Sequence, residues 1–204
     1  MTAQEFYYTI EQTALAEFKD RGSRFLAYAF PMQITDDFKK QLQTLKKEHP
    51  KAAHHCFAYR IGLDGNTFRV SDDGEPSGSA GRPILGQIDS KNITNAGVVV
   101  VRYFGGTFLG VPGLINAYKT ATVLALQLVP IVRKPVLISY RLQFDYTWMN
   151  DIMLIVKQCQ CAIEQQEISM FCTMQIGIPV ARTAEALHKL GDLQGVEAEK
   201  IEAM

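Results

Sequence analysis

The chain has 204 residues, of which 47% are hydrophobic and 21% charged, proportions that exclude a disordered chain. The N-terminus has no basic segment followed by an apolar stretch, so it does not look like a signal peptide. The longest uniform apolar run, residues 96–101, is far shorter than the ~18 residues that span a bilayer. We therefore expect a cytoplasmic protein of one large or two small domains, with no membrane partner.

Charge is unevenly distributed, although the net charge is zero. Residues 1–135 contain 16 basic and 12 acidic side chains, whereas residues 136–204 contain 5 and 9. This asymmetry favours the first part as the contact surface for a polyanion, although unequal solvated surfaces give the same pattern. The four cysteines form no C-x-x-C pair and are interpreted as reduced, mostly buried thiols.

The first part mixes strand and helix patterns. Strands are predicted at residues 6–10, 13–19, 24–32, 53–61, 67–70 and 96–103. Helices are predicted at residues 34–49, 83–90 and 112–130. The turn at Asp64-Gly65-Asn66 predicts a hairpin between the fourth and fifth strands. Four consecutive valines from Val98 predict that the sixth strand is buried on both faces.

A Pro-containing segment at residues 133–135 is interpreted as a linker, which divides the chain into domains 1–134 and 135–204. Beyond it, Tyr140, Leu142 and Phe144 alternate with polar residues, as in a half-buried strand. Two helix patterns and three further strand patterns follow. The order β-α-β-β-α-β predicts a ferredoxin-like C-terminal domain in an α+β protein.

The densest polar stretch is the loop of residues 71–82, which holds Asp72, Asp73 and Glu75 among three glycines. A loop between a strand and a helix is a usual place for a site. Its oxygens suit a divalent cation and the following helix start suits an anion, whereas a purely structural loop is the third interpretation. No metal ligand is assigned. Since neighbours on a strand face opposite ways, only one of His54 and His55 can join this loop in a cleft.

A second glycine-rich turn, Gly105-Gly106, follows the buried strand that ends at Arg102-Tyr103. Val111-Pro112 stand where a P-loop requires Lys-Ser/Thr, which argues against Walker-type ATP hydrolysis. Two interpretations stay open, contact with a phosphate backbone and tight strand-to-helix packing. For phosphate contact, the candidates are Tyr103, the two glycines, Arg102 and Lys119.

Several blocks of sequence together resemble the IMPACT/YigZ family in its bacterial form. They are Gly22-Ser23-Arg24-Phe25, Ala53-His54-His55-Cys56, Ser71-Asp72-Asp73-Gly74-Glu75-Pro76 and Arg102-Tyr103-Phe104-Gly105-Gly106. The resemblance implies an N-terminal two-layer α/β sandwich like a domain of a ribosomal protein and the fourth domain of elongation factor G. It also implies a C-terminal domain like that factor's last one. The eukaryotic relatives regulate translation through an additional N-terminal domain that is not found in this sequence.

Three functions follow as hypotheses. The first is a binding protein for RNA, DNA or the ribosome, possessing no cofactor and acting as a translation regulator. The second is a metal-assisted hydrolase that uses a divalent cation, so an enzymatic role stays open. The third is a protein-interaction module of the translation machinery.

Overall fold

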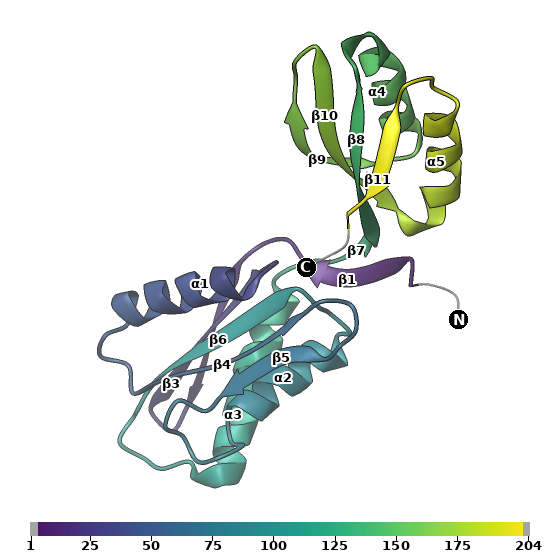
Figure 1. The fold of residues 1–204 in the computed structure, drawn as a ribbon. Helices are drawn as coiled ribbons and strands as arrows, with labels where there is room; N and C mark the ends of the chain where they lie inside the picture. Colours follow the sequence, from purple (N-terminus) through teal and green to yellow (C-terminus); the bar gives the residue numbers. More distant parts are fainter. Residues whose placement is uncertain (1–3, 202–204) are drawn as a thin grey trace. The chain divides into compact units, whose positions relative to one another are not determined.

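The computed structural model describes residues 4–201 and divides into two compact units. The first unit is Tyr7–Lys134, and the second comprises residues 135–201 together with residues 4–6 (Figure 1). No helix within the described residues is long and apolar enough to cross a membrane. The second unit resumes at residue 135, but residues 4–6, which the sequence assigned to the first domain, belong to the second unit. Independent folding of the two units stays a prediction.

The elements of the first unit agree with the predicted order. They are β1 (Phe6–Ile10), β2 (Ala14–Asp20), β3 (Ser23–Pro31), α1 (Thr35–Glu48), β4 (His54–Ile61), β5 (Thr67–Ser71), α2 (Gly81–Ser90), β6 (Ala96–Tyr103), α3 (Gly110–Gln127) and β7 (Ile131–Pro135). The predicted hairpin is confirmed, since β4 and β5 pair antiparallel with Ile61 opposite Thr67. Helix α3 begins two residues before Pro112, which suits the first turn because proline has no N–H to satisfy.

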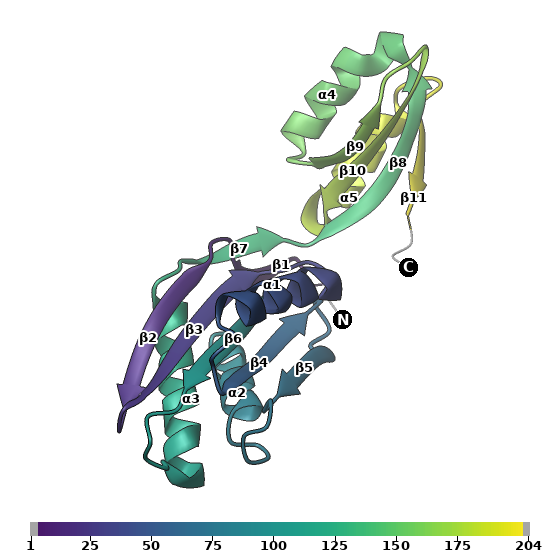
Figure 2. The same ribbon diagram turned by 90° about the vertical axis from the view of Figure 1, so that its left-hand side faces the viewer.

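A five-stranded antiparallel sheet in the order β2-β3-β6-β4-β5 forms the centre of this unit. Helices α2 and α3 cover one face and α1 lies on the other (Figure 2). Val98 and Val100 of β6 join the core under α2 and α3, whereas Val99 and Val101 join the core under α1. The prediction of a strand buried on both faces is thus confirmed. The predicted two-layer sandwich corresponds to the sheet together with α2 and α3. Helix α1 forms a further layer on the other face, because β6 is apolar on both sides.

The predicted linker at residues 133–135 is wrong, because these residues belong to strand β7, which pairs with β1. Two basic residues and a proline have low strand propensity, so local sequence does not indicate this strand. Pro135 ends the strand, a position where proline is tolerated. The Nζ atom of Lys134 lies 2.8 Å from a carboxylate oxygen of Glu11, just beyond β1.

The second unit contains β8 (Leu137–Asp145), α4 (Met149–Gln158), β9 (Ala162–Glu167), β10 (Phe171–Pro179), α5 (Thr183–Gly191) and β11 (Glu197–Lys200). Its antiparallel sheet has the order β11-β8-β10-β9. This arrangement matches the predicted ferredoxin-like β-α-β-β-α-β domain. Leu142, Met174 and Ile176 of the sheet pack with Ile152 of α4 and Leu190 of α5, so both helices cover one face.

Candidate functional site

The two predicted loops meet at one end of the five-stranded sheet. Strand β4 begins there, whereas β5 and β6 end there and continue into residues 72–80 and 104–109. The β2–β3 turn lies at the same end, because a Cβ atom added to Gly105 would overlap the backbone of Gly22 and Ser23. Side chains from four separate segments are thereby brought into reach of one another.

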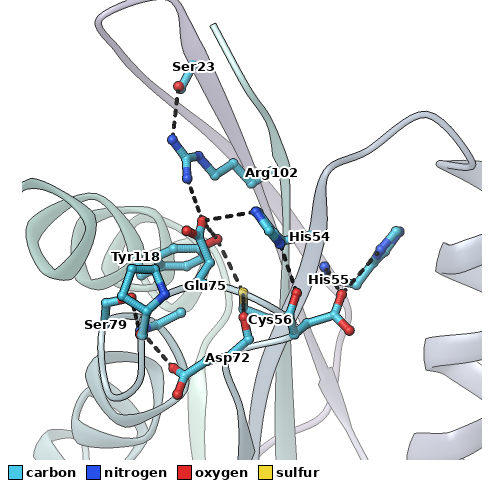
Figure 3. Close-up of polar contacts among 12 residues, drawn as sticks. Ser23, His54, His55, Cys56, Asp72, Glu75, Ser79, Arg102 and Tyr118 are labelled. Carbon is cyan, nitrogen blue, oxygen red and sulfur yellow. Dashed lines mark hydrogen bonds and ion pairs between the residues drawn. The ribbon is translucent and has the colours of Figure 1, made fainter. Parts of the chain in front are cut away.

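A buried ion pair between Glu75 and Arg102 lies at the centre of this region (Figure 3). The Arg102 Nη1 atom donates to Glu75 Oε1 at 2.5 Å, and the two side chains are only 5% and 4% exposed. A second nitrogen of Arg102 donates to the Ser23 hydroxyl, and its Nε atom is buried with no partner. The guanidinium also lies 5.4 Å and 5.6 Å from the ring centres of Phe25 and Phe104. Arg102 is therefore a core residue, whereas the sequence offered it as a candidate phosphate contact.

Tyr118 of α3 and Cys56 of β4 extend the same polar network. The Tyr118 hydroxyl donates to Glu75 Oε1 at 2.7 Å, and the Cys56 thiol lies 3.2 Å from that hydroxyl. Burial raises the pKa of Tyr118 and the pKa of Cys56. The neighbouring carboxylate of Glu75 adds to this effect on both groups. Both groups consequently stay protonated at neutral pH, and Cys56 is not an activated thiol.

His54 contacts the polar loop on the face that holds Arg102. The ring of His55, on the other face, lies 3.9 Å from the carboxylate of Asp73. The Nδ1 atom of His54 lies 2.8 Å from the backbone carbonyl oxygen of Asp73, and a carbonyl oxygen can only accept. Nδ1 therefore carries a hydrogen, while Nε2 lies 3.9 Å from Glu75 Oε1. His54 is directly opposite Arg102 in the β4–β6 pairing, so both side chains project from the same face of the sheet.

The aspartates of the loop are occupied by backbone hydrogen bonds. Asp72 accepts from the N–H groups of Gly78, Ala80 and Gly81 at 2.8–3.0 Å. Partial burial acts to raise the pKa of Asp72, but these three donors outweigh it and hold the pKa below its usual value. Asp73 accepts from the backbone N–H of His55 at 2.6 Å. Among the described residues, no three His, Cys, Asp or Glu side chains gather as metal ligands would.

Two predicted residues lie on the opposite face of the sheet, under α1. His55 is 8% exposed, and burial is the main cause that lowers its pKa. The Tyr103 hydroxyl lies 2.9 Å from His49 Nδ1, and the other ring nitrogen of His49 lies 2.7 Å from the hydroxyl of Tyr28. Strand alternation explains this outcome, since residues next to His54 and Arg102 must face the other way.

The remaining predicted residues differ in their surroundings. The backbone N–H of Gly105 donates to the Ser23 hydroxyl at 3.1 Å, which supports the interpretation of tight packing for this glycine. Gly106 has a φ of +86° and open space around it. Lys119 is exposed on α3, outside the polar network. It is four residues beyond Ile115 and eight beyond Val111, both exposed, so the three share one stripe of the helix.

A cavity of about 500 Å³ opens beside the buried ion pair. Its polar lining includes His54, Glu75 and Arg102, and Gly110 and Val111 contribute the first residues of α3. Apolar walls come from Pro76, Phe104, Phe108, Leu109 and Leu114. Phe104 and Phe108 are 46% and 86% exposed, and their ring centres are 5.3 Å apart. The site is thus an apolar pocket with a charged floor and two exposed aromatic rings at its rim.

The sequence interpretation missed Ser23, Cys56, Phe104, Phe108 and Tyr118. Cys56 could have been found, because a residue two positions from His54 on a strand shares its face. Phe108 is an aromatic side chain in a glycine-rich loop, a signal of an exposed contact residue. Tyr118 carries no local signal, since its position on α3 resembles any other buried position of that helix.

Comparison with known proteins identifies the family. Residues 21–126 match the Impact N-terminal domain. The chain belongs to the IMPACT family. It is 35% identical to the IMPACT family member YigZ of Escherichia coli strain K12, covering 84% of this chain and 85% of that protein. A crystal structure described as a hypothetical protein covers 99% of this chain and all of its own, with 30% identity and a TM-score of 0.78.

A solved structure described as the two-domain translational regulator Yih1 is 29% identical. The alignment covers 60% of this chain and 47% of that one, with a TM-score of 0.36. A rat relative named Protein IMPACT is 36% identical over 98 residues, which are 47% of this chain. The predicted family is confirmed.

Proposed function

We propose that the protein is a cytoplasmic, translation-associated factor that binds single-stranded RNA at the loop end of its first unit. The observation that carries this proposal is the exposed pair Phe104–Phe108 at the rim of the pocket. Exposed aromatic rings are stacking platforms for unpaired bases, which offer a flat face whatever their sequence. The regulation of translation by eukaryotic members of the family supports the translation-associated part of the proposal.

Two exposed cations of the first unit are suited to the RNA backbone. Arg21 adjoins Gly22, which contacts Gly105 immediately after Phe104, and Lys119 ends the exposed stripe of α3. Both side chains are exposed, and neither forms an ion pair within residues 4–201. These two residues take the place of Arg102 as the candidate phosphate contacts, because the charge of Arg102 is already neutralised by Glu75. Because only two cations are involved, we expect weak binding, with dissociation constants on the order of micromolar or above.

The test is a titration of labelled single-stranded RNA at several salt concentrations. Each phosphate contact contributes about 0.7 to the slope of log affinity against log salt, so Arg21→Ala with Lys119→Ala should lower that slope by about 1–2. The matched control is Lys40→Ala with Lys47→Ala, which removes two exposed cations from α1 on the opposite face of the sheet. An unchanged slope in the first variant, or an equal loss in both, would contradict the proposal.

A specific observation in the second unit favours protein interaction as a second candidate function. The tip of the β9–β10 hairpin exposes Ile168, Met170 and Phe171 by 59%, 79% and 76%. Exposed apolar clusters of this kind mark protein contacts. Recovery of one defined partner from lysate after nuclease treatment, lost on Met170→Ser with Phe171→Ser, would support this candidate over RNA binding.

A further inference from the structure

We infer that the pocket beside the Glu75–Arg102 pair takes a nucleotide whose base carries an exocyclic amino group. Where the ligand is RNA, the inference rests on the proposed function. It adds the chemical class of base that the pocket selects. The same chemistry is found in an unpaired residue of RNA and in a free nucleotide, and the experiment below separates these sources.

The floor of the pocket presents hydrogen-bond acceptors. The carboxylate of Glu75 lies in the lining, and its Oε1 atom already receives donors from Arg102 and Tyr118. His54 Nδ1 carries a hydrogen because it faces a carbonyl oxygen, which leaves the lone pair of Nε2 free in the neutral ring. Arg102 directs its Nη1 and Nη2 atoms to Glu75 and Ser23, and its Nε atom is buried. The acceptors on this floor, Glu75 and Nε2 of His54, suit a ligand that donates, as an amino group does.

The walls require a flat, apolar body. Phe104, Phe108, Leu109 and Leu114 line the space between the floor and solvent. The two rings are tilted by 44° to each other, so one of them can stack on a planar ligand while the other contacts its edge. A volume of about 500 Å³ lies within the range of small-molecule sites.

The start of α3 forms another wall of the pocket, and it presents hydrogen-bond donors. Gly110 and Val111 are its first residues, and the geometry of a helix leaves their N–H groups without an intrahelical acceptor. Amides at a helix start favour a negatively charged group such as phosphate. Acceptors on the floor, flat walls and donors at the helix start together fit a base with an amino group and its phosphate.

The experiment compares oligocytidine and oligouridine of equal length. These bases have the same ring size, but cytosine presents an amino group where uracil presents a carbonyl oxygen. We expect the protein to bind oligocytidine at least about fivefold more tightly. Phe108→Ala should weaken oligocytidine binding by at least about fivefold, whereas Phe68→Ala, an exposed phenylalanine on β5 outside the pocket, should not. Phe108 is 86% exposed, so this variant retains the fold.

Free nucleotides separate the pocket from RNA binding as a whole. Cytidine monophosphate should shift the amide resonances of Gly110 and Val111, and uridine monophosphate should shift them less. If RNA does not bind but cytidine monophosphate does so selectively, the proposed function fails and the pocket inference stands. Equal affinity for the two bases in both formats, no binding in either, or equal effects of Phe108→Ala and Phe68→Ala overturns the inference.

Discussion

Removal of one partner from the Glu75–Arg102 pair should strongly destabilise the first unit. Glu75→Gln preserves the shape of the side chain and removes its charge, so the guanidinium of Arg102 remains without a counter-ion. Both side chains are at most 5% exposed, and loss of one partner from a buried pair costs about 3–5 kcal/mol. In a unit of roughly 130 residues, each kcal/mol lowers the thermal midpoint by about 3–5 °C. We therefore expect a fall of about 10–20 °C.

The assay is thermal unfolding followed by circular dichroism, completed by a double-mutant cycle. Arg102→Met alone leaves a buried carboxylate without a counter-ion. The double variant, Glu75→Gln with Arg102→Met, buries no charge, so its loss of unfolding free energy should be smaller than the sum of the two single losses by at least about 2 kcal/mol. Lys39→Met is the matched control, because Lys39 and Asp36 also form an ion pair at 2.8 Å, but with side chains 65% and 62% exposed. It should not shift the midpoint measurably. Small, additive losses in the two single variants would refute the reasoning.

Three further predictions concern packing, pH and domain structure. Gly105→Ala should destabilise the first unit more than Gly106→Ala, since only the former places a Cβ in neighbouring backbone; denaturant midpoints in the reverse order would contradict this. Because burial lowers the folded-state pKa of His55, stability should fall as pH drops below about 6.5; His55→Phe should flatten this dependence, and the control His188→Gln, with a 79% exposed side chain, should preserve it. Residues 1–134 alone should unfold in one cooperative calorimetric transition, and a broad, non-cooperative one would refute their independence.

The sequence by itself determined the elements of both units except β7, together with the β4–β5 hairpin. Periodicity predicted α1, and the turn at Asp64-Gly65 predicted the β4–β5 hairpin, because neighbouring residues impose these structures. The valines of β6 predicted a strand that is buried on both faces, because such a strand is apolar on each side. Alternation along β4 also established that its two histidines face opposite sides of the sheet. The prediction that only one of them joins the polar loop is wrong, because Asp73 contacts His54 through its backbone carbonyl and His55 through its carboxylate.

Only the tertiary structure decided which charges are available for binding. In the sequence, Arg102 at the end of a strand resembles an exposed phosphate contact, and Glu75 resembles a member of an acidic loop. Their mutual distance depends on the register of three strands and on the position of α3, so it cannot be read locally. The same long-range pairing made β7 a strand despite its composition. Exposure of Phe108 and burial of Arg102 are consequences of packing between segments far apart in the chain, and no local pattern encodes that packing.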